Sequence, residues 1–402
     1  MPPKRLLPRL ALCAAALAVL AAAAVVLRLT AAREPAAEAP PLPAAPARPD
    51  GAWPIFRGDQ ALRGVAAVTL PDKLELAWRF ETKDQVTSSA VIGGGVVYVG
   101  SCDGNVYAID ARTGKERWRF PTEDQVQAAP LLLGDTLYVG GDDSFLYAID
   151  AASGRLKWKY ETGDKIIGGA NFWRPPDGGP ARIIFGGYDY KVHCVDGATG
   201  AKLWEYSTGN YVNGAPAVAG DAVIVGGCDA VLHVIDAADG ARRGAIDAGA
   251  YVAASTPVDG GRAYVGNFNG RVLCVDIRAE AAGAPVVWSY EGSGEAFFSA
   301  PAVAADRIVA GSRDKRLHCI DKAGGAGLWS FAARDNIDGA PVVCGDKVVV
   351  GSNDGRLYLV RLADGAEAGV YDVGAAISAS PAVAPGLLVV GADDGFVYAF
   401  AW

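Results

Sequence analysis

The chain has 402 residues, of which 51 are Gly and 23 are Pro, and it has a single Met; this composition favours many short strands and turns over long helices. Its net charge is −8. Residues 1–52 carry six Lys or Arg and three Asp or Glu, a net of +3, so residues 53–402 carry −11, which argues against nucleic acid as a partner because phosphate binding needs positive charge.

The amino-terminal segment, residues 1–30, is predicted to be a membrane anchor or an export signal. Three basic residues precede an uncharged apolar run over residues 10–27, which Arg28 ends. This run just reaches the length of a helix that spans a bilayer and exceeds a typical signal-peptide core. We therefore expect one hydrophobic helix that anchors the chain, with cleavage near residues 30–32 as the alternative. In both cases the remainder is exported, either membrane-anchored on the extracytoplasmic side or secreted.

Residues 31–52 are rich in Ala and Pro ("AAEAPPLPAAPARP") and are predicted to be a semi-extended linker. The remaining residues, 53–402, are predicted to form one repeat domain. Its unit is visible in GSCDGNVYAIDARTGKERWRF (100–120) and GGDDSFLYAIDAASGRLKWKY (140–160).

The unit occurs eight times with a period near 40 residues. The Gly that opens it recurs at Gly100, Gly140, Gly186, Gly226, Gly266, Gly311, Gly351 and Gly391. An Asp or Asn follows three residues later in every copy, and most copies carry a Trp, at Trp118, Trp158, Trp204, Trp288 and Trp329. A period of this length indicates stacked supersecondary units.

Each unit is predicted to contain four strands. The first is short and ends at Pro, as in QVQAAP (125–130), the second is apolar, the third alternates, and the fourth carries the Trp. A tight turn of the Gly-x-Asp-Gly type joins the second strand to the third. Four-stranded units around an axis make a β-propeller. The sequence therefore predicts an all-β, eight-bladed propeller whose Trp side chains fill the gaps between neighbouring blades.

Counting strands predicts how the ring closes. The last copy, GADDGFVYAFAW (391–402), ends after its third strand, and a strand without a blade, LELAWRF (74–80), precedes the first copy. We expect this amino-terminal strand to pair with the carboxyl-terminal strand, because closure removes exposed sheet edges.

The repeat resembles the PQQ-like (quinoprotein-type) repeat family. YAIDARTGKERW (107–118) and YAIDAASGRLKW (147–158) are close matches, and LHCIDKAGGAGLW (317–329) is a degraded one. The resemblance implies the propeller fold for residues 74–402. It does not imply one chemistry, because one branch comprises PQQ-dependent alcohol and sugar dehydrogenases and another comprises non-enzymatic propellers that resemble the outer-membrane assembly factor BamB. The segment WPIFRGDQALRGVA (53–66) resembles the lead-in of the second branch.

The histidines and most cysteines follow the repeat. His193, His233 and His318 stand seven residues after the repeat Gly, where four other copies carry Tyr. We interpret them as packing residues, which leaves no His as a general base or metal ligand. Cys194, Cys274 and Cys319 occupy the next column, where a free Cys acts as a small hydrophobe, and Cys102 and Cys228 precede the turn Asp on blades too far apart for a disulfide.

An acidic collar is the first candidate for partner binding. Six positions before the strand-one Pro, six copies carry an acid or its amide, at Asp84, Asp124, Asp164, Asn210, Glu295 and Asp335; Tyr251 and Ala375 take this position in the other two. The collar cannot chelate calcium, because neighbouring blades lie about 10 Å apart and calcium needs oxygens at about 2.4 Å. These residues are either solvated turn residues or a collar whose field attracts a basic partner.

The insertion NFWRPPDGGPAR (171–182) is the second candidate for partner binding, through Trp173 and Arg174. Function often concentrates in a long loop outside a repeat. The alternative is a surface elaboration without a role.

These patterns favour a non-catalytic, membrane-tethered propeller that binds an envelope protein or peptide. The alternative is a PQQ-dependent dehydrogenase, which needs a metal held by carboxylate and amide oxygens, a catalytic Asp, and aromatic planes around the cofactor. Units of about 40 residues leave little chain to cover a cofactor. The candidates for facing the channel, Asn213, Asp338, Phe297 and Phe298, match no motif of that branch.

We therefore expect no catalytic, cofactor-binding or metal-binding residues, and PQQ as the cofactor only under the alternative. A cytoplasmic WD-type propeller does not fit the amino-terminal segment, and the sequence lacks the Gly-His and Trp-Asp signature of those repeats.

Overall fold

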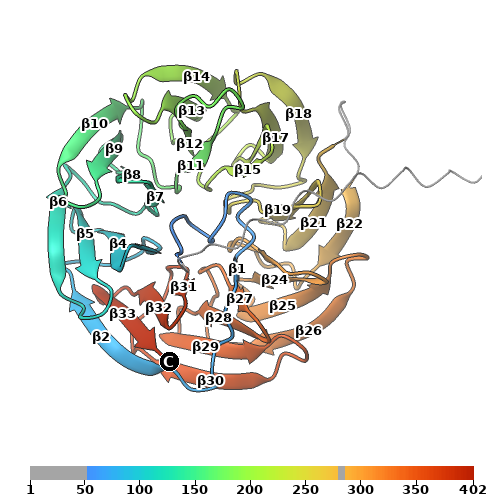
Figure 1. Cartoon of the computed structure of the whole chain (residues 1–402). Coiled ribbons are helices and arrows are strands. Elements are labelled where there is room, and N and C mark those ends of the chain that lie inside the picture. Colours follow the sequence, from blue (N-terminus) through green and yellow to red (C-terminus); the bar gives the residue numbers. More distant parts are fainter. Residues whose placement is uncertain (1–51, 279–285) are drawn as a thin grey trace, which may run out of the picture. The chain divides into compact units, whose positions relative to one another are not determined.

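The computed structural model describes residues 52–278 and 286–402. These residues form eight sheets arranged around a central axis (Figure 1). Strands and turns make up this part of the chain, and no helix in it is long and apolar enough to cross a membrane. The predicted hydrophobic helix within residues 1–30 and the predicted linker up to residue 51 lie outside the described residues.

Each sheet contains one blade of four strands, ordered from the axis outward, and one sheet has β1 as a fifth strand, so the predicted eight-bladed propeller is confirmed. The innermost strands are β3 (Val91–Gly93), β7 (Leu131–Leu133), β11 (Asn171–Trp173), β15 (Ala217–Ala219), β19 (Val258–Asp259), β23 (Ala302–Val303), β27 (Val342–Cys344) and β31 (Ala382–Ala384). The second strands are β4 (Val96–Ser101), β8 (Thr136–Gly140), β12 (Arg182–Gly186), β16 (Ala222–Gly226), β20 (Arg262–Gly266), β24 (Arg307–Gly311), β28 (Lys347–Gly351) and β32 (Leu387–Gly391).

Successive side chains of the third strands face the two neighbouring blades in turn. These strands are β5 (Asn105–Asp110), β9 (Phe145–Asp150), β13 (Lys191–Asp196), β17 (Val231–Asp236), β21 (Arg271–Asp276), β25 (Arg316–Asp321), β29 (Arg356–Arg361) and β33 (Phe396–Ala401). The outer strands are β6 (Glu116–Pro121), β10 (Leu156–Glu161), β14 (Lys202–Ser207), β18 (Arg242–Asp247), β22 (Val286–Glu291), β26 (Gly327–Ala332) and β30 (Glu367–Asp372). The eighth outer strand is β2 (Glu75–Glu81), which pairs antiparallel with β33 and places Trp78 opposite Ala399. The first and last strands of blade eight therefore come from opposite ends of the domain.

The prediction that the first strand of each unit ends at Pro is wrong. In the second blade, Pro130 precedes β7, and residues 125–130 run along the axis outside the ladder. Because Pro has no N–H, it cannot donate to a ladder that continues through it. The N–H of Val126 bonds instead to the carbonyl oxygen of Ser101 in the preceding blade, at 3.1 Å. These segments therefore join neighbouring blades near the axis.

A Trp from the outer strand of one blade packs against the turn between the third and fourth strands of the next. The packed pairs are Trp78–Gly114, Trp118–Gly154, Trp158–Gly200, Trp204–Gly240, Trp288–Gly325 and Trp329–Gly365, and a Cβ added to any of these glycines would lie 2.6–2.8 Å from the indole ring. Each indole N–H also donates to a backbone carbonyl of the same turn, at 2.9–3.3 Å. The predicted role of Trp between blades is confirmed.

The Gly that opens each repeat is required by a second contact between blades. A Cβ added to Gly100 would lie 2.4 Å from Cγ1 of Val126 in the next blade. The same contact joins Gly391 of the last blade to Val86 of the first. Any larger residue at these positions would push neighbouring blades apart near the axis.

Residues 53–66 lie across one mouth of the central channel (blue in Figure 1). Backbone hydrogen bonds tie this segment to the innermost strands of six blades, at Ile92, Leu132, Val218, Val258, Val303 and Val343. The side-chain amide of Gln60 also donates a hydrogen bond to the carbonyl of Phe172 in β11, at 2.6 Å. The segment ends in β1 (Val65–Ala66), which pairs parallel with β27. It therefore forms a plug over this mouth.

Arg57 holds the plug in place from inside the protein. Its side chain is buried, and its guanidinium donates to the carbonyls of Pro341, at 2.9 Å, Pro301, at 2.6 Å, and Leu62, at 3.1 Å. Burial lowers the pKa of Arg57 to about 9, which still leaves the side chain charged at neutral pH. The three charge-assisted hydrogen bonds of Arg57 therefore link two blades to the plug.

We expect Gly240→Ala to destabilise the domain more than Gly220→Ala. Both glycines of the fourth blade have positive φ, +76° and +58°, so both substitutions cost about 1–2 kcal/mol through the backbone. A Cβ at Gly240 also meets Trp204 at 2.8 Å, whereas nothing lies within 4 Å at Gly220; overpacking of this kind costs a further ~1–3 kcal/mol. Urea unfolding followed by Trp fluorescence measures both, and equal losses would contradict the proposed packing.

Candidate binding site at the channel mouth

A cavity of about 160 Å³ lies on the propeller axis. Its wall includes one residue from each of seven neighbouring blades, Thr87, Gln127, Ile167, Asn213, Ala253, Phe298 and Asp338, which we call the inner ring. Phe56 of the plug lines the same cavity. The plug therefore closes one end, and within residues 52–278 and 286–402 the opposite mouth is the open end of the cavity.

A second ring of side chains surrounds this open mouth. It consists of the residue two positions after each repeat Gly, namely Cys102, Asp142, Tyr188, Cys228, Phe268, Arg313, Asn353 and Asp393. Contacts with the inner ring place it there: Gln127 donates to Asp142 at 2.7 Å, and the guanidinium of Arg313 lies 4.2 Å from the ring centre of Phe298. We call this set the mouth ring.

Two carboxyl groups stand on one side of the mouth ring. Asp142 accepts from Gln127, and Asp393 accepts from Ser378 at 2.9 Å. Burial raises the pKa of both carboxyl groups. The nearest amine to Asp142 is that of Lys165, at 3.9 Å. The negative charge of both acids is therefore compensated less than it would be in a close ion pair.

The third axial acid is paired. Asp338 lies 2.9 Å from Nε of Arg313 and accepts from the amide of Asn353 at 3.0 Å. Arg313 in turn covers Phe298. These three residues link the sixth and seventh blades, and Arg313 compensates the charge of Asp338.

An arc of aromatic side chains occupies the third to sixth blades at the same mouth. It consists of Tyr188, Tyr190, Tyr211, Tyr251, Phe268 and Phe298, which we call the aromatic arc. Its rings contact one another in two groups of three, with centroids 4.5 Å apart for Tyr188 and Tyr211 in the first and 5.9 Å apart for Phe268 and Phe298 in the second. Tyr251 is 55% exposed and Tyr190 is 44% exposed. The mouth is thus polar on one side and aromatic on the other.

Several acceptor atoms around the axis lack a partner among the described residues. Oδ1 of Asp142, Asn213 and Asn353 is buried without a hydrogen bond. Buried acceptors are normally satisfied by protein, water or ligand. The site therefore favours a ligand that brings hydrogen-bond donors.

The predicted acidic collar lies at the connections between blades. Each side chain of Asp84, Asp124, Asp164, Asn210 and Asp335 accepts a hydrogen bond from the N–H of the following residue, at 2.7–2.9 Å. Asp335 also lies 3.5 Å from the amine of Lys315. These contacts give the residues a turn-forming role. Attraction of a basic partner by the collar, Glu295 included, stays a prediction.

The two residues predicted for the insertion differ in accessibility. Trp173 is 5% exposed, and its indole N–H donates to Asp221 at 3.2 Å. Arg174 is exposed and lies 5.5 Å from the ring centre of Phe172. Trp173 therefore packs between blades, and only Arg174 is free to meet a partner directly.

Of the four residues predicted to be candidates for facing the channel, three do so. Asn213, Phe298 and Asp338 line the cavity. Phe297 is 1% exposed and packs against Tyr290 and His318. Its side chain points between blades because successive residues of an extended segment face opposite ways.

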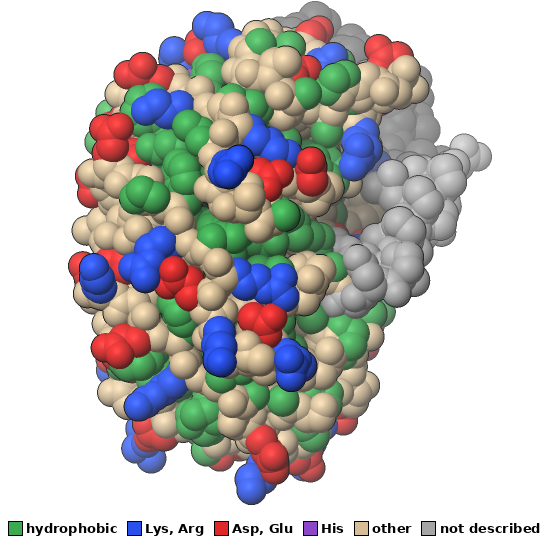
Figure 2. Space-filling view, turned by 60° about the vertical axis from the view of Figure 1, so that its left-hand side comes forward, with side chains coloured by type: hydrophobic (Ala, Val, Ile, Leu, Met, Phe, Trp, Pro, Cys, Tyr) green, Lys and Arg blue, Asp and Glu red, His purple; other side chains and the backbone are tan. Residues whose placement is uncertain are grey.

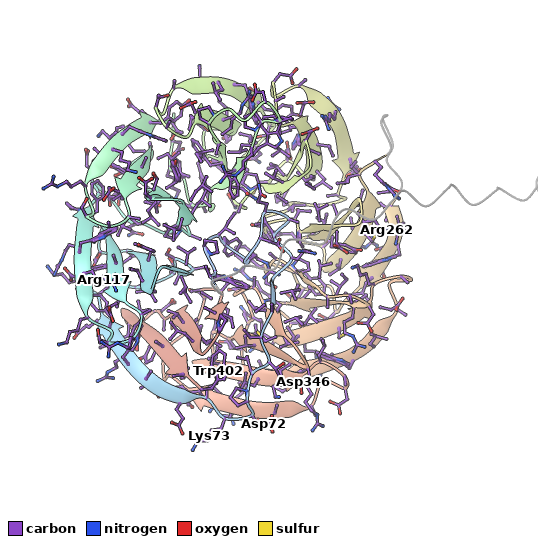
Figure 3. All side chains as sticks on the ribbon, viewed as in Figure 1. Asp72, Lys73, Arg117, Arg262, Asp346 and Trp402 are labelled. Carbon is purple, nitrogen blue, oxygen red and sulfur yellow. The ribbon has the colours of Figure 1, made fainter. Side chains whose placement is uncertain are left out.

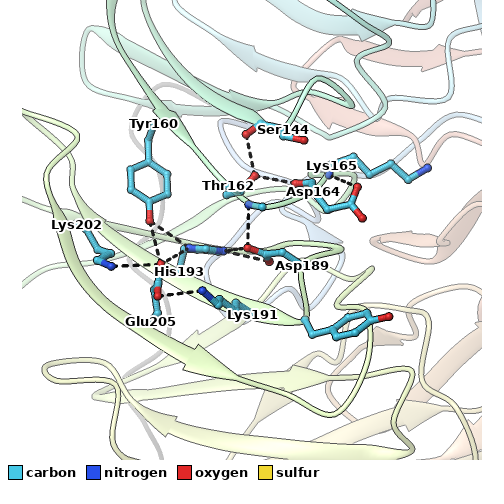
Figure 4. A network of polar contacts seen from close by, with 12 residues as sticks. Ser144, Tyr160, Thr162, Asp164, Lys165, Asp189, Lys191, His193, Lys202 and Glu205 are labelled. Carbon is cyan, nitrogen blue, oxygen red and sulfur yellow. Dashed lines mark hydrogen bonds and ion pairs between the residues drawn. The ribbon is translucent and has the colours of Figure 1, made fainter.

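The three histidines occupy the packing position predicted for them. In their place other blades carry a Tyr whose hydroxyl donates to the turn Asp, as Tyr107 does to Asp103 at 2.7 Å. The histidines make the equivalent contact, with Nε2 of His193 3.0 Å from Oδ2 of Asp189 (Figure 4). His233 and His318 contact Asp229 and Asp314 in the same way.

The second ring nitrogen of each His meets a Tyr of the preceding blade. Tyr160, Tyr206 and Tyr290 place their hydroxyls 3.0–3.3 Å from Nδ1 of His193, His233 and His318. Where the inner residue is Tyr107, Tyr147 or Tyr358, the preceding blade instead supplies Phe80, Phe120 or Phe331, with ring centroids 5.1–5.3 Å apart. At these six junctions the residue of the preceding blade changes together with the inner residue, and the histidines serve packing.

The cysteines of the described part are free. Burial raises the pKa of Cys194 and Cys319 to about 12 and of Cys274 to about 11. These thiols are therefore protonated at neutral pH and unsuited to nucleophilic attack. Cys102 lies at the mouth, 3.7 Å from Oγ1 of Thr87, and burial raises its pKa as well.

A family described as outer membrane protein assembly factor BamB matches residues 65–171, 172–279, 241–331 and 280–401. No curated protein sequence matches the chain. Among solved structures, BamB from Moraxella catarrhalis is similar, with a TM-score of 0.68 and 18% identity over 82% of this chain and 100% of that one.

Two enzymes are structurally as similar. Quinohemoprotein alcohol dehydrogenase from Comamonas testosteroni has a TM-score of 0.70 and 17% identity over 87% of this chain and 80% of that one. A europium-containing methanol dehydrogenase has a TM-score of 0.71 and 14% identity over 88% and 98%. At these identities the structures share the fold alone, so the site has to decide between binding and catalysis.

We expect the stability of the domain to fall below about pH 6.5 in part through His233. Burial lowers the pKa of His233 below its usual value of 6.5, against the opposing effect of Asp229. The unfolded chain therefore binds a proton on this residue at a higher pH than the folded chain does, and acid favours unfolding. The double variant Tyr206→Phe/His233→Tyr rebuilds the Phe–Tyr pair and should lose less stability between pH 7.5 and 5.5.

Urea unfolding at both pH values measures the difference. Phe120→Leu, which alters an equivalent pair without a His, is the control and should keep the pH dependence of the wild type. An unchanged pH dependence in the double variant would show that His233 carries no proton linkage.

Proposed function

Because the chain belongs to the family of the outer membrane protein assembly factor BamB, we propose that it is a non-catalytic protein-interaction module of the cell envelope. In this proposal the segment 1–30 tethers it to the membrane, and the propeller binds an envelope protein or peptide on the extracytoplasmic side. Support for the tether comes from the apolar run over residues 10–27 and the linker that follows it. Release by cleavage near residues 30–32 is the alternative for this segment.

The observation that carries the proposal is the aromatic arc at the open mouth. Tyr190, Tyr211, Tyr251 and Phe268 are all 36% exposed or more, on neighbouring loops. Aromatic side chains are enriched at protein interfaces and dominate their binding energy. Exposed rings that a rigid ring of blades holds in contact lose little entropy on binding.

The outer strands expose aliphatic side chains, such as Leu156 and Leu203, beside charged ones. Figure 2 shows basic and acidic side chains interspersed over the side of the disc that it faces. Several of them pair with each other, as Arg117 does with Asp110 and Arg119 with Glu116. Exposed pairs of this kind contribute little to binding or stability. The open mouth is therefore the better candidate for a partner.

The residues at the mouth do not fit a PQQ group with its metal. Such a group needs several oxygen ligands together beside the cofactor. Within residues 52–278 and 286–402, no three His, Cys, Asp or Glu side chains lie close enough to hold an ion. Asp338, Asp142 and Asp393 are each bonded to a different neighbour. Binding of PQQ with calcium and alcohol-dependent dye reduction would favour the dehydrogenase alternative instead.

We expect a photo-crosslinking amino acid at Tyr251 to capture a membrane or envelope protein in cells that make the full chain. The same amino acid at Arg117, on the outer circumference (Figure 3), is the matched control and should give no specific adduct. Adducts are detected as shifted bands and identified by mass spectrometry. Equal adducts at both positions, or none at Tyr251, would contradict binding at the mouth.

A further inference from the structure

We propose that the open mouth binds an extended peptide segment with a basic side chain, whose ammonium or guanidinium group lies on the side formed by Asp142 and Asp393. This inference rests on the proposed function, because it specifies the ligand of the same site. Asp142 and Asp393 belong to the second and eighth blades and flank Cys102 of the first.

Charge at the mouth favours a cation. The mouth ring and inner ring together contain Asp142, Asp338, Asp393 and one base, Arg313. Arg313 forms an ion pair with Asp338, so the other two carboxyl groups carry the net charge. Asp393 has no ion pair among the described residues, and Lys165 approaches Asp142 only to 3.9 Å. A basic side chain on this side could form an ion pair with one of the two carboxylates and would partly offset the charge of the other.

The hydrogen-bond pattern favours the same ligand. The side chain of Asp142 is 9% exposed, and its Oδ1 lacks a donor. Oδ1 of Asn353 and Oδ1 of Asn213 also lack donors. Lys offers three donors and Arg five, and neither brings an acceptor. A ligand rich in acceptors would leave these atoms unsatisfied.

The shape of the site favours a side chain rather than a folded element. The cavity of about 160 Å³ ends at Phe56 of the plug, so a chain cannot pass through it. A peptide laid across the mouth would send one side chain inward and rest its neighbours on Tyr211, Tyr251 and Phe268. These rings are exposed and bind both apolar groups and cations.

Pools of immobilised dodecapeptides test the proposal. Each pool has one fixed central residue, Lys, acetyl-lysine or Glu, and random residues elsewhere, and the probe is the full chain in mild detergent. We expect the Lys pool to retain at least tenfold more protein than either other pool. Asp142→Asn/Asp393→Asn should abolish that preference, and Tyr251→Ala/Phe268→Ala should reduce retention on all pools.

Asp306→Asn/Asp364→Asn is the matched control. It removes the same two charges from exposed turns, where Asp306 pairs with Arg307 and Asp364 with Arg361, and should keep the wild-type preference. Equal retention on Lys and acetyl-lysine pools, or an equal loss in the control, would overturn the proposal. If such a result occurred while Tyr251 still gave adducts, the proposed interaction role would remain and only the basic ligand would be rejected. If both the Lys preference and the adducts were absent, both proposals would be rejected. Circular dichroism of each variant confirms folding.

Discussion

The packing of a Trp from one blade against a Gly turn of the next is the contact on which the ring depends. It recurs at six of the eight junctions, and each time the indole N–H also binds a carbonyl of that turn. The repeat Gly adds a second contact near the axis. Since each blade touches only its neighbours, stability is close to a sum of such junctions.

At two junctions between blades the outer strand has Gly in place of Trp. Gly244 and Gly369 stand where other outer strands carry Trp. A Cβ at Gly369 would meet the carbonyl oxygen of Asp72 at 2.3 Å, so the chain entering β2 takes the space of the missing indole. The amino-terminal part of the domain thus plugs the axis, fills a junction and supplies the outer strand of the last blade. One mouth is closed as a consequence, and the other stays open.

The repeat predicted most of the fold and little of the site. Periodic Gly, Asp and Trp residues encode contacts that recur in most blades, so the units could be aligned with one another, and the alignment predicted eight four-stranded blades. The strand boundary at Pro130 was wrong because an extended segment and a ladder strand look alike in sequence. The plug could not be predicted, since Arg57 binds carbonyls of Pro301 and Pro341, and such backbone contacts at long range leave no pattern. Phe297 and Phe298 could not be assigned to opposite sides without the register.

The mouth ring was missed although the sequence contains a signal for it. The position two residues after the repeat Gly varies among Cys, Asp, Tyr, Phe, Arg and Asn within an otherwise regular unit. Variation alone does not mean function. The column five positions later also varies, but His193, His233 and His318 each meet a Tyr of the preceding blade, whereas Tyr107, Tyr147 and Tyr358 each meet a Phe.

The mouth ring shows compensation at only some positions. Arg313 forms an ion pair with Asp338, and Gln127 donates a hydrogen bond to Asp142. However, Oδ1 of Asp142 and Oδ1 of Asn353 have no donor, and at the same mouth Tyr251 and Phe268 are exposed. A buried acceptor without a donor costs about 1–3 kcal/mol, and an exposed ring forgoes the gain of burial. A molecule that supplies donors to these acceptors and covers these rings would recover both free-energy contributions at once.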